Sequence, residues 1–162
     1  MCIRDRPFSI GDYVEIGASE GTVGEIGLVH TILHTIDNKK VYIPNADVSA
    51  ARITNYTAEA TRRLDLVFSI SYQDNIELAK ETILEVLRQN PLARQEPAPL
   101  VRVCAYSSSS VDIACRVWVD TADYWTLNYD LFEQVKLAFD AAGISIPFQQ
   151  VDLHVVEGSR QF

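Results

Sequence analysis

The chain has 162 residues, in which 14 Lys and Arg stand against 22 Asp and Glu, giving a formal net charge of −8. This acidic balance argues against a surface that tracks nucleic-acid phosphates, and no stretch reaches the roughly 18 to 20 apolar residues that a membrane-spanning helix needs. The length fits one domain or two small ones, and we expect two, over residues 7–60 and 61–157. We expect residues 1–6 to be a leader outside the native structure, without a signal peptide's apolar core, and residues 158–162 to be a short tail.

The first half is predicted to be a small all-β unit. Residues 9–16 alternate apolar and polar side chains, and the glycine-rich run after them leads into further extended segments with a turn signal at 37–38. Residues 41–43 form another short strand, which Pro44 should end or place at a sheet edge, because proline cannot donate to a ladder. With an extended segment at 52–56 this makes about five short strands, the spacing of a small SH3-like or Sm-like β-barrel.

A short helical turn is predicted after Pro44. Asn45 is a favourable N-cap for a turn over residues 46–51, and its replacement by Ala should then cost about 1 kcal/mol.

The second half opens with a half-buried strand over residues 62–71. Asp74, with Glu77 three residues later, predicts the N-cap of a helix that ends near Asn90, before a proline. The apolar stripe of this helix is expected to consist of Ile76, Ala79, Ile83, Val86 and Leu87.

Two further strands, 100–106 and 111–119, flank four serines, and Asp123 then offers a cap for a second helix. Gly143 should end that helix, and Val151–Val156 alternates as a last half-buried strand. The order β-α-β-β-α-β predicts a ferredoxin-like domain, so the chain as a whole should be α+β. The stripe of the second helix is expected to be Trp125, Tyr129, Phe132, Val135 and Phe139, with Leu131 beside it.

The sequence predicts no catalytic, cofactor or metal site. The glycines of residues 17–27 match neither a dinucleotide-binding nor a phosphate-binding loop. His30 and His34 would lie ~13 Å apart along a strand, too far to share an ion. Ser107–Ser110 lacks the glycines of a nucleophile elbow. The aromatic cluster Trp118, Tyr124 and Trp125 is better explained by core or subunit packing than by stacking on a ligand.

The cysteines, Cys2, Cys104 and Cys115, form no CxxC motif and leave an odd count. Cys104 and Cys115 fall in the two strands that flank the serines and could approach each other. Buried free thiols in a reducing compartment are the simpler interpretation.

Several segments resemble the small-conductance mechanosensitive (MscS-type) channel family over about residues 7–157. They are PFSIGDYVEIG, GTVGEIGLVHTILHTIDNKKVYIPN and ITNYT in the first half, and FDAAGISIPFQQVDLHV at the end of the second. Gln149 departs from the family's usual Pro-aromatic-Pro-Gln, and Ala46 stands where many relatives have Gly. In this family the pore-lining helix enters directly before the segment that holds Pro7, Phe8, Gly11 and Asp12.

The resemblance implies that this chain is the cytoplasmic vestibule, or cage, of a channel at the inner membrane of a prokaryote. The implied partners are other copies in a homoheptamer, the membrane-spanning helices of the full-length chain, and permeating ions and osmolytes. It implies a pore-helix docking corner at Ile43, Pro44, Asn45 and Ala46, and a domain junction and portal at Glu59, Arg62, Arg63 and Asp65. It also implies a C-terminal strand bearing Val151, Leu153 and Val155.

Two other functional classes stay open on the sequence. A soluble RNA-binding module with Sm-like and ferredoxin-like domains is disfavoured by the acidic charge and by the lack of an aromatic-basic RNA motif. A ligand-sensing regulatory domain is compatible with a ferredoxin-like fold, which does not by itself determine function.

Overall fold

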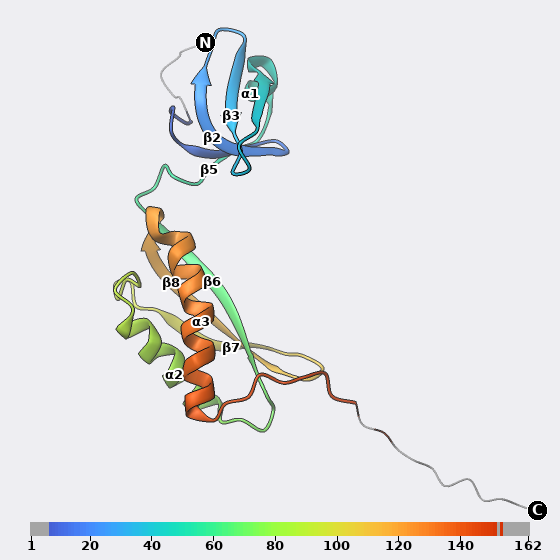
Figure 1. Cartoon of the computed structure of the whole chain (residues 1–162), viewed down its shortest axis with the longest axis vertical. Coiled ribbons are helices and arrows are strands. Elements are labelled where there is room, and N and C mark those ends of the chain that lie inside the picture. Colours follow the sequence, from blue (N-terminus) through green and yellow to red (C-terminus); the bar gives the residue numbers. More distant parts are fainter. Residues whose placement is uncertain (1–6, 152, 154–162) are drawn as a thin grey trace, which may run out of the picture. The chain divides into compact units, whose positions relative to one another are not determined.

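The computed structural model describes residues 7–151 and 153, and the chain divides into two compact units. The first contains the chain up to Arg62 together with Asp120–Asp123, and the second contains Arg63–Val119 and the chain from Tyr124 onward. Each unit has its own hydrophobic core. Figure 1 shows the β-rich first unit and the mixed helix–sheet second unit, which are described separately below.

The first unit is an antiparallel sheet with the strand order β4-β3-β2-β1-β5. The five short strands confirm the predicted β-rich unit, although β1 is shorter than expected. Within the described residues the pairing stops at edge strands β4 and β5, so no closed barrel is formed by these pairings. The elements are β1 (Tyr13–Ile16), β2 (Ser19–Ile26), β3 (His30–His34), β4 (Lys40–Pro44), α1 (Asn45–Ala50) and β5 (Ile53–Asn55).

Alternation along the strands places one apolar face inside, as expected for side chains with a period of two. The buried core of this unit is formed by Phe8, Val14, Ile16, Val23, Leu33, Ile43 and Val48. β2 carries a bulge between Val23 and Glu25, and Gly21 passes so close to β3 that a Cβ there would lie 2.6 Å from the His34 carbonyl oxygen. Glycine at this position therefore permits the close approach of two strands.

The second unit is a three-stranded sheet with the order β6-β8-β7, combined with two helices. Figure 1 shows α2 and α3 on the same side of the strands. Their buried faces form one core with the inward residues of the sheet, such as Leu64, Phe68 and Ile113. The elements are β6 (Thr61–Ile70), α2 (Ile76–Gln89), β7 (Leu100–Tyr106), β8 (Val111–Asp120), a 3-10 turn (Thr121–Asp123) and α3 (Tyr124–Ala142). The α+β class is confirmed.

The start of α2 corrects the predicted cap by one residue. Asn75, and not Asp74, caps the helix, because its side-chain oxygen accepts from the amides of Glu77 at 2.9 Å and Leu78 at 3.2 Å. The Asp74 carboxylate instead accepts from the Ser145 amide at 2.8 Å. Asp74 therefore ties the turn before α2 to the segment after α3. The predicted stripe of α2 and its end before Asn90 are confirmed.

The predicted stripe of α3 is only partly correct. Val135, Phe139 and Leu131 are buried, but Trp125, Tyr129 and Phe132 are 59%, 62% and 48% exposed, and Leu127 is buried instead. The helix has apolar residues on two faces, and the sheet covers only one of them.

The end of α3 follows the prediction, because Gly143 has a φ of +74° and takes the left-handed conformation of a helix stop. The next segment carries no regular structure. Of the predicted last strand, Val151 and Leu153 are exposed and lie outside any strand. Val155 and the rest of that strand lie outside the described residues, as do residues 1–6 and 158–162.

Candidate functional site

The corner after β4 is organised by the side chain of Asn45. Its amide nitrogen donates to the carbonyl oxygens of Gly27 and Leu28, both at 3.0 Å, and its amide oxygen accepts from the Thr31 hydroxyl at 2.9 Å. The Asn45 backbone amide adds a bond to the Val29 carbonyl at 2.8 Å. One residue at the start of α1 thus holds the whole connection between β2 and β3.

The predicted capping role of Asn45 is wrong. Asn45 is the first residue of α1, the capping position belongs to Pro44, and no side chain caps this helix. The reason is local geometry: Pro44 at φ −54° and ψ 136° turns the chain directly into the helix. The amide of Asn45 is then free to point at the neighbouring β2–β3 turn.

The connection that Asn45 holds presents apolar side chains to solvent. Leu28 is fully exposed and Val29 is 65% exposed, whereas Ile43 at the end of β4 is buried in the core. Pro44 and Ala46 are exposed on either side of Asn45. The corner therefore combines a backbone fixed by hydrogen bonds with an uncovered apolar tip.

The four predicted junction residues do not form one cluster. Arg63 and Asp65 make a two-pronged ion pair at 2.7 and 2.8 Å, and Arg116 lies 4.0 Å from the same carboxylate. The Arg62 guanidinium instead lies over the Tyr56 ring, 5.1 Å from its centroid. The Glu59 side chain is exposed, and within the described residues it makes no hydrogen bond or ion pair with these groups. Its backbone carbonyl accepts a hydrogen bond from the Thr121 hydroxyl.

The sequence did not indicate Asn55, whose side chain makes five hydrogen bonds to other described residues. Its amide nitrogen donates to the Pro7 carbonyl at 3.1 Å and to the Asp12 carboxylate at 2.9 Å. Its amide oxygen accepts from the backbone amides of Thr57 and Ala58, both at 3.0 Å. The local signal for this residue is an Asn at a strand end, because Asn side chains often bond the backbone two residues on in an Asx-turn.

The described residues also bear on the chemical alternatives. No group of three His, Cys, Asp or Glu side chains within them could hold a metal ion. Cys104 and Cys115 are free thiols; Cys115 is buried, and burial raises its pKa to about 12. Cys104 is exposed, which corrects the expectation that both are buried.

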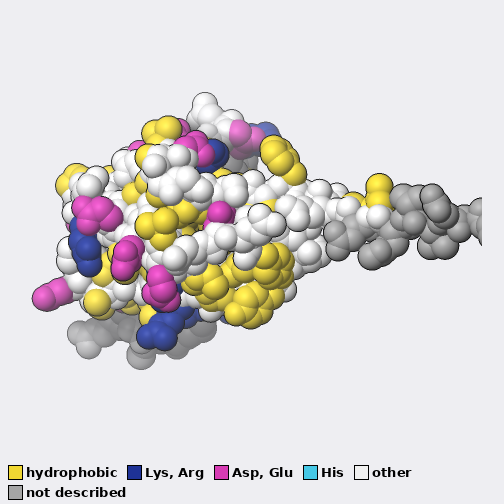
Figure 2. Space-filling view, turned by 90° about the horizontal axis from the view of Figure 1, so that it is seen from below, with side chains coloured by type: hydrophobic (Ala, Val, Ile, Leu, Met, Phe, Trp, Pro, Cys, Tyr) yellow, Lys and Arg dark blue, Asp and Glu magenta, His cyan; other side chains and the backbone are white. Residues whose placement is uncertain are grey.

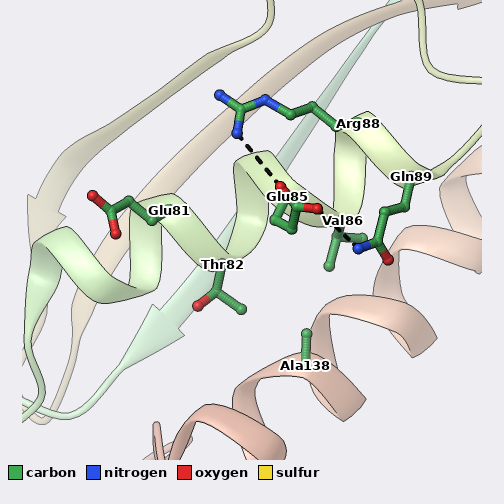
Figure 3. Close-up of a pocket in the computed structure, with 7 residues that line it drawn as sticks. All are labelled: Glu81, Thr82, Glu85, Val86, Arg88, Gln89 and Ala138. Atoms are coloured by element: carbon green, nitrogen blue, oxygen red, sulfur yellow. Dashed lines mark hydrogen bonds and ion pairs between the residues drawn. The ribbon is translucent and has the colours of Figure 1, made fainter.

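A hollow lies between α2 and α3 in the second unit. Figure 3 shows that Glu85 faces Arg88 and Gln89 along α2, and that the small side chain of Ala138 on α3 leaves the space open. Glu85 pairs with Arg88 at 3.5 Å and accepts from Gln89 at 2.9 Å. Glu85, Arg88 and Gln89 thus pair with one another at the surface, and the Thr82 hydroxyl donates to the Leu78 carbonyl at 2.7 Å and not to a base.

No helix among the described residues is both long and apolar enough to cross a membrane. Residues 1–58 match the family profile described as the mechanosensitive ion channel beta-domain. Residues 64–146 match the profile described as the C-terminal part of the mechanosensitive ion channel MscS.

Individual proteins agree with these profiles. The chain is 35% identical over 157 residues to a small-conductance mechanosensitive channel of Edwardsiella ictaluri, covering 97% of this chain and 55% of that protein. It is 36% identical over 148 residues to an uncharacterised MscS family protein of Archaeoglobus fulgidus, covering 91% and 52%.

Among solved structures, the closed-state crystal structure of Helicobacter pylori MscS matches with a TM-score of 0.89 and 30% identity, over 94% of this chain and 60% of that one. The chain thus spans little more than half the length of these relatives. Two adjoining family profiles, the relatives and this shared fold together show that the chain belongs to the MscS family of mechanosensitive ion channels.

Proposed function

We propose that this chain is the cage below the pore of a mechanosensitive channel, at the cytoplasmic face of a prokaryotic inner membrane. In this proposal the full-length protein is a homoheptamer whose membrane-spanning helices precede Pro7. It releases ions and small osmolytes when hypo-osmotic shock raises membrane tension. The observation that carries the proposal is the match of both units, in one chain, to Helicobacter pylori MscS. The family is one of ion channels and not of enzymes.

The corner at Ile43, Pro44, Asn45 and Ala46 is proposed to dock the incoming pore helix. Its support is the exposed Leu28, which sits on a backbone that Asn45 holds by hydrogen bonds to two carbonyl oxygens. An apolar side chain on a rigid connection suits contact with an apolar helix, because little conformational entropy remains to be lost on docking.

Assembly is proposed to cover the apolar surface that the isolated chain exposes. Trp125 and Tyr129 are stacked with ring centroids 6.2 Å apart, and both are more than half exposed. Figure 2 shows a view of the chain in which hydrophobic side chains gather among acidic and basic ones. Exposed aromatic groups of this kind are enriched at protein interfaces.

The acidic character is proposed to favour cations near the openings of the cage by a modest, salt-screened amount. Glu59 carries more of this effect than Asp65, because the Asp65 carboxylate is already paired with Arg63 and lies near Arg116. Reversal potentials in a salt gradient should therefore respond to Glu59→Gln and respond less to Asp65→Asn. If neither variant changes the cation–anion preference, the cage is a support and not an electrostatic filter.

The experiment for the proposal as a whole uses the full-length channel that carries this region. It is expressed in cells without their own mechanosensitive channels and tested for survival of hypo-osmotic shock and for pressure-gated currents in excised patches. Leu28→Ser should shift the pressure threshold, since it removes the apolar tip of the corner. Leu78→Ser, on the exposed side of α2, is the matched control and should leave the threshold unchanged. The proposal would be refuted if cells expressing the wild-type channel did not survive the shock and their patches carried no pressure-gated current.

A further inference from the structure

We propose that Asn55 is a positioning residue that ties the segment entering the first unit to the segment leaving it. The incoming segment is residues 7–12, and the outgoing segment is residues 57–58. The inference rests on the proposed function, in which the pore helix arrives at Pro7 and the cage domain follows the first unit. A displacement of the arriving helix would then be passed through one amide group to the start of the chain that leads to the cage.

The incoming arm is formed by the amide nitrogen of Asn55. Besides its bond to the Pro7 carbonyl, it donates to the Asp12 carboxylate, which also accepts from the Ser9 amide at 2.8 Å. The bonds link residues that lie 48 and 43 positions apart in the chain. Gly11, at a φ of +97°, allows the backbone to turn sharply beside this carboxylate. The turn of the incoming segment is therefore closed by the Asp12 carboxylate, which Asn55 also bonds.

The outgoing arm is formed by the amide oxygen of Asn55. It accepts from the amides of Thr57 and Ala58 and from the Thr57 hydroxyl at 3.2 Å. The Thr57 hydroxyl oxygen in turn accepts from the Tyr13 amide at 3.0 Å, directly after the incoming segment. The first residues that leave β5 are thus fixed to the same amide group, and through Thr57 also to the start of β1.

The two arms use different atoms of one planar group. The nitrogen can only donate and the oxygen can only accept, so each arm depends on a distinct half of the amide. Asn55→Asp keeps an oxygen for the outgoing arm and replaces the donor with an oxygen. That oxygen would face the Pro7 carbonyl and the Asp12 carboxylate, and the incoming arm would be cut by repulsion. The Asn-to-Asp change therefore removes the incoming arm and keeps the outgoing arm.

The test compares pressure thresholds of the full-length channel with wild-type sequence, Asn55→Asp and Thr57→Val. Asn55→Asp cuts the incoming arm, and Thr57→Val removes the hydroxyl that joins the outgoing arm to Tyr13. Asn55→Asp should lower the threshold, because the arriving helix no longer has to move the chain beyond it. Thr57→Val should lower it less, because the bonds from the Asn55 amide to both segments remain. Asn75→Ala is the matched control: it removes an amide that accepts from two backbone amides at the start of α2, and it should leave the threshold unchanged.

Hydrogen exchange provides a second readout that a general loss of stability would not reproduce. The amides of Thr57 and Ala58 should keep their protection in Asn55→Asp and lose it in Asn55→Ala. An unchanged or raised threshold in Asn55→Asp, when the wild-type channel opens under pressure, would overturn this inference and leave the proposed function standing. A wild-type channel that never opens would overturn both.

Discussion

Replacement of Asn45 by Ala tests whether the corner is held by a hydrogen-bond network or by a helix cap. A lost cap would cost about 1 kcal/mol. The observed contacts predict more, because Thr31 is 1% exposed and its hydroxyl would lose its partner inside the protein. An unsatisfied buried hydroxyl costs about 1–3 kcal/mol, and the two bonds to the Gly27 and Leu28 carbonyls add about 0.5–1 kcal/mol each where water replaces them poorly.

The free energy of unfolding of the first unit should therefore fall by about 2–5 kcal/mol in Asn45→Ala. Both tryptophans, Trp118 and Trp125, lie in the second unit, so tryptophan fluorescence is the wrong probe. Native-state hydrogen exchange of the β2 and β3 amides follows the correct unit. Asn75→Ala, which removes a true cap from α2, serves as the control with an expected loss of about 1 kcal/mol in the second unit.

A double-mutant cycle with Thr31→Val determines whether the network reasoning holds. If the hydroxyl and the Asn45 amide are partners, the double variant should lose clearly less stability than the sum of the single variants. A loss of 1 kcal/mol or less in Asn45→Ala, together with strict additivity in the cycle, would refute the network.

Three further outcomes follow from single contacts. Gly21→Ala should destabilise the first unit in a urea titration, because the new Cβ would meet a backbone carbonyl of β3 at 2.6 Å; unchanged stability would contradict the close approach. Hydrogen bonds from the Ser107 hydroxyl and from two other serines near it lower the pKa of Asp112 from 3.8. The carboxylate therefore stabilises the fold above pH 3.8, and this contribution is lost as the pH falls through the lower pKa of the folded state. Acid titration of Asp112→Asn should lack this loss. A maleimide should label Cys104 in the native protein and Cys115 only after unfolding, as peptide mass mapping would show; fast native labelling of Cys115 would contradict its burial.

Regular elements could be predicted from the sequence because they depend on short periods. Alternation identified β6 and β8, and the helical spacing of Ile83 and Leu87 identified the buried face of α2. The buried face of α3 was harder to predict, because both Trp125 and Leu127 are large apolar residues that could face the core. Size alone does not decide which of them is buried. Long-range side-chain bonds had no local signal: Asn45 meets Gly27 across 18 positions.

The small core of the first unit explains why two asparagines organise it. Its buried hydrophobic cluster is much smaller than that of the second unit, and its core residues lie mainly on the strands. Connections between strands therefore gain little from packing, and their backbone groups need other partners when they are shielded from water. A planar amide supplies a donor and an acceptor together, which neither a carboxylate nor a hydroxyl can do in the same geometry. Asn45 bonds the β2–β3 connection, and Asn55 bonds the segments that enter and leave the unit. In the proposed function these parts meet the rest of the channel, and hydrogen bonds, not core packing, fix their conformation. Changes at these amides should for that reason affect gating and lower the stability of the first unit, while the core of the second unit is unaffected.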